Sequence, residues 1–309
     1  MKYKGTEDIK LNNTVVTVGK FDCFHKGHQL IFRVASEMKK PGMEQVIFMF
    51  DTNPGDVVKQ RKGKYIVAQK ERKPLSKRYG VDHCIEYPFT ESTRNMSPEE
   101  FVSDVLVKKL GIKACVAGDD FRFGKDRAGD TDTLIELGKK YGFEVEIVKR
   151  ISYKGRIISS TLIRERLLEG DIEEVNQMLG RPYSISGLIS KGNHVGSANE
   201  VPTINFQPPE DKLLPPDGVY ATKTLIDGKE YISITNIGVR PTFYEESDRY
   251  IETFILDFSG DLYGKNAEVC FYRFVRPEKK FENSSALYEQ ISKDITETRK
   301  YFSGNKTNE

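Results

Sequence analysis

Short apolar runs alternate with helical stretches through residues 1–150, and this alternation limits the possible fold more than any other feature. The runs have the length of strands and are rich in β-branched and aromatic residues; they are residues 14–18, 45–50, 113–117 and 144–148. Strands that alternate with helices form a parallel sheet covered on both faces, so the first half predicts an α/β domain. Such sheets bind ligands at the carboxyl ends of their strands.

One predicted helix in this half has both of its ends marked. Ser97 and Glu100 form a capping box, and Pro98 suits the first helical position. Gly111 tolerates the left-handed conformation that ends many helices. We therefore predict a helix from residue 98 to about residue 110.

The pattern changes after residues 180–182 (GRP). From residue 183 to about residue 276, short β-rich segments are separated by turn residues, which predicts a small antiparallel barrel. Asp227-Gly228 lies between two apolar runs and predicts a hairpin turn. The predicted domains are therefore residues 1–182 and 183–309.

Helical patterns flank the predicted barrel. Residues 161–180 are helical with an interruption at Gly170-Asp171, and residues 284–302 form a terminal helix. The last residues, 303–309, are predicted to be a loose tail.

Composition excludes several classes of protein. The 309 residues contain 48 Lys and Arg against 46 Asp and Glu, a net charge of +2, which argues against a nucleic-acid partner. The mean hydropathy of −0.53 argues against a membrane partner, and no secretory signal is visible. Four widely spaced cysteines are typical of reduced thiols. We expect a cytoplasmic enzyme acting on small molecules, as a monomer or weak homo-oligomer.

Residues 19–28 (GKFDCFHKGH) follow the first predicted strand and begin a helix. Gly19 and Gly27 let backbone N–H groups approach an anion, which the helix N-terminus also favours. His25 and His28 are three residues apart, so both can face one ligand and donate to the α-phosphate of a nucleotide. Phosphoryl and nucleotidyl transfer need positioning and electrostatics rather than a protein nucleophile.

Two other interpretations of these histidines remain open. Cys23 could join His25 and His28 in binding a metal, although their spacing matches no zinc pattern and no fourth ligand is near in sequence. Alternatively, the two histidines are ordinary surface residues.

Two further segments carry side chains suited to ligands. Residues 159–161 (SST) can cap a helix and contact phosphates, and Arg164 one turn later can bind them bidentately; an ordinary capped helix is the alternative. Phe121 and Phe123 flank Arg122 and either stack on a flat ring or pack in the core.

Residues 19–28 resemble the G-x-F-D-G-x-H-x-G-H motif of bacterial bifunctional riboflavin kinase/FAD synthetases, and H-x-G-H is the signature of the nucleotidylyltransferase superfamily. Further segments resemble family motifs in the same order: residues 118–124 (GDDFRFG), 158–164 (ISSTLIR), 180–183 (GRPY), 201–205 (VPTIN), 236–242 (NIGVRPT), 250–257 (YIETFILD), 261–265 (DLYGK) and 276–281 (RPEKKF). The resemblance spans about residues 12–302.

This resemblance implies two domains with two activities. The first is a nucleotidylyltransferase-type α/β domain with a Rossmann-like parallel sheet, which adenylylates FMN to FAD and releases pyrophosphate. The second is an antiparallel β-barrel of the riboflavin kinase type with a terminal helix, which phosphorylates riboflavin to FMN. ATP would be a substrate of both steps, with Mg²⁺ as cofactor.

The resemblance also implies roles for single residues. The catalytic residues would be His25, His28, Arg164 and Glu252, with Glu252 as the base of the kinase. The nucleotide-binding residues would be Gly19, Phe21, Asp22, Gly27, Asn53, Ser159, Ser160, Thr161, Gly192, Gly196, Thr203 and Asn205. The flavin-binding residues would be Asp120, Phe121, Arg122, Phe123 and Arg276. The Mg²⁺ ligands would be Thr203 and Asn205.

The chain departs from the family pattern at four positions. Cys23 replaces a Gly, and Asn53 replaces a His that could carry charge. In the glycine-rich kinase loop, Ser197 replaces an Arg and Glu200 replaces a Gly. A carboxylate beside ATP phosphates repels them, so we expect adenylylation to be faster than phosphorylation. One alternative is a relative that keeps a single activity, for which FMN adenylyltransferase is favoured over the kinase. The other is a flavin- or nucleotide-binding regulator.

Overall fold

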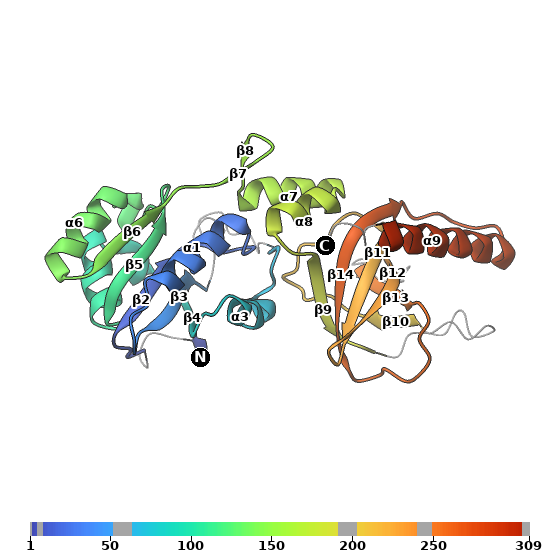
Figure 1. Cartoon of the computed structure of the whole chain (residues 1–309), viewed down its shortest axis with the longest axis horizontal. Coiled ribbons are helices and arrows are strands. Elements are labelled where there is room, and N and C mark those ends of the chain that lie inside the picture. Colours follow the sequence, from blue (N-terminus) through green and yellow to red (C-terminus); the bar gives the residue numbers. More distant parts are fainter. Residues whose placement is uncertain (1, 5–8, 52–63, 191–202, 240–248, 305–309) are drawn as a thin grey trace. The chain divides into compact units, whose positions relative to one another are not determined.

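The computed structural model describes residues 2–4, 9–51, 64–190, 203–239 and 249–304. The chain divides into two compact units, Met1–Ser160 and Thr161–Glu309, each built on its own sheet (Figure 1). Within the described residues, no helix is long and apolar enough to span a membrane. None of the four cysteines, all of which are described, forms a disulfide.

The first unit contains six parallel strands in the order β1-β4-β3-β2-β5-β6. These strands are β1 (Lys2–Lys4), β2 (Thr14–Val18), β3 (Glu44–Phe50), β4 (His83–Tyr87), β5 (Ile112–Gly118) and β6 (Glu144–Val148). The parallel sheet predicted from the sequence is thus confirmed. The order reverses between β2 and β5, which makes their carboxyl ends the switch point where doubly wound sheets bind ligands.

Helices cover both faces of this sheet. They are α1 (Lys26–Glu37), α3 (Gln69–Arg78), α4 (Glu91–Asn95), α5 (Pro98–Glu100), a π-helix (Phe101–Val107), a 3₁₀ turn (Lys125–Arg127) and α6 (Thr131–Tyr141). Helix α1 packs on β2 and β5, with Ala35 against Val15 and Val116 (Figure 1). The π-helix and α6 contribute Leu106 and Leu134 to the core on the opposite face. A two-stranded hairpin, β7 (Ser152–Tyr153) with β8 (Arg156–Ile157), follows the sheet.

The helix predicted from residue 98 is confirmed, with one difference in its hydrogen bonding. Ser97 accepts from the Glu100 N–H, the Glu100 carboxylate accepts from the Ser97 N–H, and Gly111 has a φ of +56°. Its middle, however, has π-helical hydrogen bonds from Phe101 to Val107, which residue types alone do not reveal.

Strand β4 is absent from the sequence prediction because its residues look polar. All five of its residues are buried, including His83 and Glu86. The Glu86 carboxylate lies 3.8 Å from the guanidinium of Arg72, which is also buried. The buried charge of Glu86 is tolerated because Arg72 of α3 supplies the opposite charge. The sequence around Glu86 alone does not indicate this pairing.

The second unit contains six antiparallel strands in the order β10-β13-β12-β11-β14-β9. They are β9 (Tyr183–Leu188), β10 (Thr203–Phe206), β11 (Gly218–Ile226), β12 (Lys229–Val239), β13 (Arg249–Ile255) and β14 (Asn266–Arg276). Beyond β9, the Ser190 N–H and hydroxyl both donate to the carbonyl of Asn205 in β10, at 2.9 and 3.0 Å. The two edge strands therefore meet, as the predicted barrel requires.

The helices of this unit agree with the sequence prediction. They are α7 (Ser160–Glu169), α8 (Ile172–Leu179) and α9 (Ser284–Gly304), and Gly170 separates the first two with a φ of +82°. The predicted turn at Asp227-Gly228 joins β11 to β12 with both residues at positive φ. Residues 305–309 of the predicted tail lie outside the described residues.

Helix α9 is joined to the barrel by a buried ion pair between Arg276 and Asp294. The Arg276 guanidinium at the end of β14 donates to both carboxylate oxygens of Asp294, at 3.1, 3.1 and 2.8 Å. Asp294 is 4% exposed, and Gln290 also donates to it. Removing one partner leaves the other charge only partly solvated, which costs more than an exposed ion pair.

We predict that Asp294→Ala lowers the free energy of unfolding of the second unit by about 3 kcal/mol, because Arg276 loses its buried partner. Urea unfolding followed by circular dichroism measures the change. Glu289→Ala is the matched control, because Glu289 forms an exposed ion pair with Lys293 on the same helix. Equal effects of the two substitutions would contradict a supporting role for the Arg276–Asp294 pair.

Candidate active site

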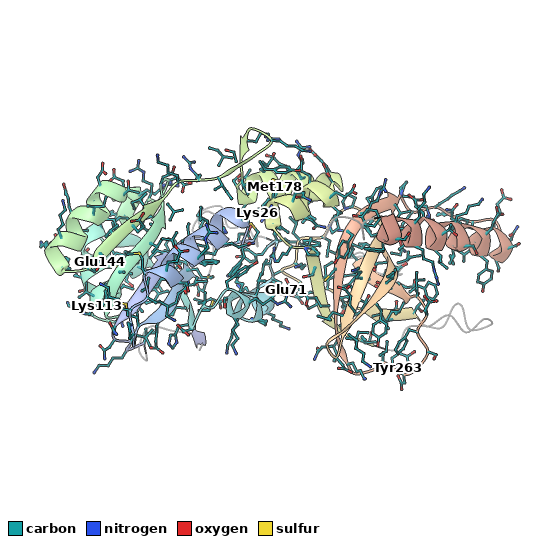
Figure 2. All side chains as sticks on the ribbon, viewed as in Figure 1. Lys26, Glu71, Lys113, Glu144, Met178 and Tyr263 are labelled. Carbon is teal, nitrogen blue, oxygen red and sulfur yellow. The ribbon has the colours of Figure 1, made fainter. Side chains whose placement is uncertain are left out.

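The loop between β2 and α1 holds the two histidines of the predicted phosphate site at the switch point. Lys26, labelled in Figure 2, is the first residue of α1, and His25 is its N-cap. The Nδ1 atom of His25 accepts the backbone N–H of His28 at 3.2 Å. Because Nδ1 is an acceptor, neutral His25 carries its proton on Nε2, which can donate to a ligand.

The two imidazoles are stacked on each other. Their centroids are 3.6 Å apart with an angle of 17° between the ring planes. Burial and the neighbouring charge of His25 together hold the pKa of His28 well below its usual value, so His28 is neutral near pH 7. The pair therefore offers hydrogen-bond donors at the positive end of a helix, which suits a phosphate.

Phe21 holds the loop in a strained conformation. It has a φ of +38° and Phe24 a φ of +52°, an arrangement that costs about 1–3 kcal/mol for each bulky residue. The buried Phe21 ring meets His28 edge-on, with centroids 5.0 Å apart. A Cβ at Gly19 would lie 2.9 Å from this ring, so only glycine fits there. Strain concentrated beside two histidines is typical of a functional site.

Gly27 leaves room for a neighbouring side chain. A Cβ at this position would lie 3.0 Å from Cε1 and 3.1 Å from Nδ1 of His25. The sequence predicted that Gly27 lets the backbone approach an anion, and the structure adds that Gly27 leaves room for the capping imidazole.

The serine-rich segment begins beside this loop. The Cys23 sulfur lies 3.4 Å from the Ser160 hydroxyl, so two motifs that are 137 residues apart in sequence meet. Ser159 and Ser160 are half-buried, while Thr161 is exposed. Arg164 is half-buried and lies one turn into α7, which begins at Ser160. The family resemblance assigned residues of both motifs to nucleotide binding, and the structure adds that the motifs are in contact.

The segment after β5 lies on the other side of the switch point. Phe121 and Phe123 stack with centroids 5.2 Å apart, and Phe123 is buried in the core against Phe101. The half-buried Phe121 keeps exposed surface that a ligand can contact, whereas the buried Phe123 packs against the Phe121 ring. Of the two alternatives given by the sequence, stacking on a ligand ring or packing in the core, the second therefore describes Phe123.

Charged residues near this segment are held by ion pairs. Arg122 lies 2.7 Å from Asp130, the N-cap of α6, and exposed Asp120 lies 3.7 Å from Arg150. Hydrogen bonds from Thr133 and then from Arg122 lower the pKa of Asp130 to about 2. To contact a ligand, the Arg122 guanidinium must therefore give up part of its ion pair with the Asp130 carboxylate.

The candidate kinase residues lie in a row across three strands. Asn205 on β10 and Asn236 on β12 both stand directly opposite Glu252 on β13. Residues opposite each other share one face of a sheet, with Cβ atoms about 5 Å apart. Glu252 is half-buried and Asn205 is 6% exposed, so this carboxylate stands in a polar row rather than on an open surface.

The neighbouring residue explains why Glu252 is held on this face. Thr253 points to the barrel interior, where its hydroxyl lies 2.9 Å from that of Thr235. A network of buried hydroxyls continues from there; its members are Thr222, Thr224, Ser233, Thr235 and Thr253. Slipping β13 by one residue would bury Glu252 in this network, so the register is strongly determined.

Sequence reasoning did not assign Asn236 and Glu278 to a site. The Asn236 amide donates to the Glu278 carboxylate at 3.0 Å, while the amide oxygen is buried with no hydrogen-bond partner among the described residues. The signal that could have found Asn236 is its alternation with buried Thr235 and Ile237. The guanidinium of Arg276, which the family resemblance assigns to flavin binding, donates to the Asp294 carboxylate.

Several predicted site residues cannot be placed. Asn53, Gly192, Gly196, Ser197 and Glu200 lie outside the described residues. Thr203 is described and half-buried at the start of β10, opposite Phe254.

Two groups of side chains have the chemistry of metal ligands. Thr203 and Asn205 offer oxygen atoms, which suit a hard cation. Cys23, His25 and His28 offer sulfur and nitrogen atoms that lie within 4.8 Å of one another. The spacing of the second group matches no zinc motif, yet the fold brings its three members together.

Comparison with known proteins matches each half of the chain to a family model. Residues 7–162 match the FAD synthetase model, and residues 179–302 match the riboflavin kinase model. Similar curated proteins are the bifunctional riboflavin kinase/FMN adenylyltransferases of Buchnera aphidicola (strain Sg), Listeria monocytogenes and Escherichia coli (strain K12). They are 36%, 35% and 31% identical, covering 97%, 94% and 93% of this chain and 98%, 93% and 92% of their own lengths.

A solved structure also matches over nearly the whole length. It is described as a macrolide-efflux protein from Streptococcus pneumoniae, is 30% identical, and superimposes with a TM-score of 0.86. The match covers 97% of this chain and 98% of that one.

We predict that Gly27→Ala displaces the His25 ring by a few tenths of an ångström, because the added Cβ would contact it at 3.0 Å. Imidazole NMR measures this: the resonances of His25 and His28 should move while those of His83 on β4 stay, which provides a reference in the same spectrum. Gly304→Ala is the control, because a Cβ there meets nothing within 4 Å. Unmoved His25 and His28 signals in Gly27→Ala would show that the loop absorbs the methyl group.

Proposed function

The chain belongs to the bifunctional riboflavin kinase/FMN adenylyltransferase family, and we propose from this premise how its own residues make FAD in two steps. In the first step, the γ-phosphoryl group of ATP is transferred to riboflavin, which gives FMN. In the second step, a phosphate oxygen of FMN attacks the α-phosphorus of a second ATP, and pyrophosphate leaves. Both half-chain matches favour this reading over a single-activity relative or a regulator.

The stacked pair of His25 and His28 at the switch point carries the proposal for adenylyl transfer. Negative charge builds on the α-phosphate and the leaving pyrophosphate during the displacement. Nε2–H of His25 and the ring of His28 stabilise this charge together with the N-terminus of α1. Neutral imidazoles suffice because each acts as a donor rather than as an acid.

The remaining contacts of this half fall to the residues around the loop. Ser159 and Ser160 bind the phosphates beside the loop, and the family resemblance gives the same role to Thr161 and Arg164. Gly19, Phe21, Asp22 and Gly27 shape the nucleotide loop, and Asn53 adds a donor. The flavin ring lies against Phe121, with Asp120, Arg122 and Phe123 positioning that surface.

Glu252 acts as the base of the kinase step. Its carboxylate accepts the proton of the ribityl 5′-hydroxyl as the oxygen bonds to the γ-phosphorus and ADP leaves. The polar row with Asn205 and Asn236 keeps this carboxylate oriented while leaving it half-exposed to substrate. Gly192 and Gly196 belong to the ATP loop, and Arg276 supports the flavin side by holding α9.

Mg²⁺ fits the donor set at the start of β10. The Thr203 hydroxyl and the Asn205 amide oxygen are hard ligands of the kind that Mg²⁺ prefers, and phosphate oxygens and water complete such sites. Bound there, Mg²⁺ would neutralise charge on the phosphates of ATP. Glu252, directly opposite Asn205, remains available for the proton.

The proposal assigns adenylyl transfer to residues 1–182 and phosphorylation to residues 183–309. The family matches at 7–162 and 179–302 support one activity for each half of the chain. Asn176 of α8 donates to the Phe271 carbonyl of the barrel, so α8 packs on the strands of its own unit. We further propose that the protein works in the cytoplasm on small molecules, without nucleic acid, as a monomer or weak homo-oligomer.

We predict that His28→Ala lowers FAD formation from FMN by roughly 10³-fold, because a transition-state donor is lost. FMN formation from riboflavin should persist, since its residues lie in the second unit. Chromatography of flavins after separate half-reactions measures both. Arg33→Ala is the control, an exposed residue on the same helix that pairs with Glu37. Equal loss of both products from folded protein would refute the assignment of two separate sites.

We predict that Glu252→Gln lowers FMN formation by about 10²-fold, because glutamine keeps the shape but cannot accept the proton. Conversion of supplied FMN to FAD should not change. Glu230→Gln is the matched control, a carboxylate on β12 that is exposed and bound to Lys223. A normal kinase rate in Glu252→Gln would make Glu252 a structural residue.

A further inference from the structure

The cluster of Cys23, His25 and His28 has a chemistry that adenylyl transfer does not need. Each residue offers one ligand atom, and these atoms lie within 4.8 Å of one another. Cys23 and His25 are buried, whereas His28 is partly exposed, so the cluster is closed on one side and open on the other. Phosphate binding requires donors, but a thiol sulfur is a poor one.

A second observation points to a ligand at this place. The Nδ1 atom of His28 is buried and has no hydrogen-bond partner among the described residues. A buried imidazole nitrogen without a partner is unfavourable, and binding to a metal ion would satisfy it. Without a metal, the His28 ring lies against the stacked His25 ring and the edge of the Phe21 ring.

We propose that Cys23, His25 and His28 bind one thiophilic divalent cation, with Zn²⁺ as the probe, and that this ion blocks the adenylyl-transfer site. Sulfur and imidazole nitrogen select zinc, whereas Mg²⁺ prefers oxygen ligands. Tetrahedral coordination at normal bond lengths brings such ligand atoms to about 3.3–3.7 Å from one another. The present separation therefore closes by about 1 Å, and the two stacked rings turn out of their parallel arrangement so that one nitrogen of each points at the ion. Water takes the fourth position.

Zinc binding and phosphate binding exclude each other at His25. A metal on Nε2 removes the proton that this atom would donate to a phosphate. In neutral imidazole the proton then moves to Nδ1, so the capping hydrogen bond to the His28 N–H is lost. Giving up one neutral hydrogen bond lowers the zinc affinity by about fivefold. The same ring thus cannot serve both ligands.

Metal binding is tested without any measurement of activity. Reduced, metal-free protein is titrated with Zn²⁺ against a chromogenic chelator, and with Co²⁺ to observe a thiolate-to-metal absorption band. We expect one equivalent of metal and a thiolate band. Cys23→Ser and Cys23→Gly should lose the band and bind Zn²⁺ weaker by on the order of 10²-fold or more. Cys270→Ser, a partly exposed cysteine of the barrel, is the control and should match wild type.

Unchanged zinc affinity in both folded Cys23 variants would overturn the proposed site, as would its loss in Cys270→Ser. Thermal unfolding shows whether each variant is folded, and two different replacements at Cys23 guard against a local defect. NMR adds an independent result, because zinc should shift the signals of His25 and His28 but not those of His83.

The inhibitory effect rests on the proposed function and has its own experiment. FAD formation from FMN is measured with and without Zn²⁺, each protein relative to its own zinc-free rate, and a zinc-selective chelator should restore activity. Wild type should be inhibited, and Cys23→Ser should need on the order of 10²-fold more zinc for the same inhibition. Zinc binding without any FAD formation would refute the proposed function but leave the metal site intact. FAD formation that zinc leaves unchanged would refute the blocking role.

Discussion

The hydrogen bond from the His28 N–H to Nδ1 of His25 determines most of the geometry of the first site. It makes an imidazole the cap of α1, where serine, threonine or aspartate is more usual. The capping ring must lie across the first turn, and a side chain at residue 27 would strike it. The same bond fixes the proton of neutral His25 on Nε2. One local interaction therefore sets the helix start, the need for glycine and the direction of the donor.

The barrel determines its site by a different constraint, the alternation of side chains along strands. Thr253 and Thr235 share a hydrogen bond inside the barrel, so Glu252 and Asn236 must lie on the other face. Five buried hydroxyls would be costly without partners, and their mutual hydrogen bonds form only in one register. The position of the proposed base thus depends on residues that touch no substrate.

The sequence predicted those features of the fold that depend on local patterns. The strands at residues 14–18 and 144–148, the capping box at Ser97 and the turn at Asp227-Gly228 were all identified from neighbouring residues. Strand β4 was not, because the buried charge of Glu86 is compensated by Arg72 on another element. Pairings between distant residues leave no local signal, which is also why the sequence did not predict the contact between Cys23 and Ser160.

The roles of single residues show the same limit. Arg276 and Asp294 are 18 residues apart, and only the packing of α9 on the barrel reveals that they form a pair. Cys23 is the opposite case, because its possible partners His25 and His28 are close to it in the sequence. In the folded loop its sulfur joins two imidazoles whose arrangement is already set by the capping bond. Because zinc binding breaks that bond, the arrangement that favours an anion and the arrangement that binds zinc compete for the same imidazole of His25.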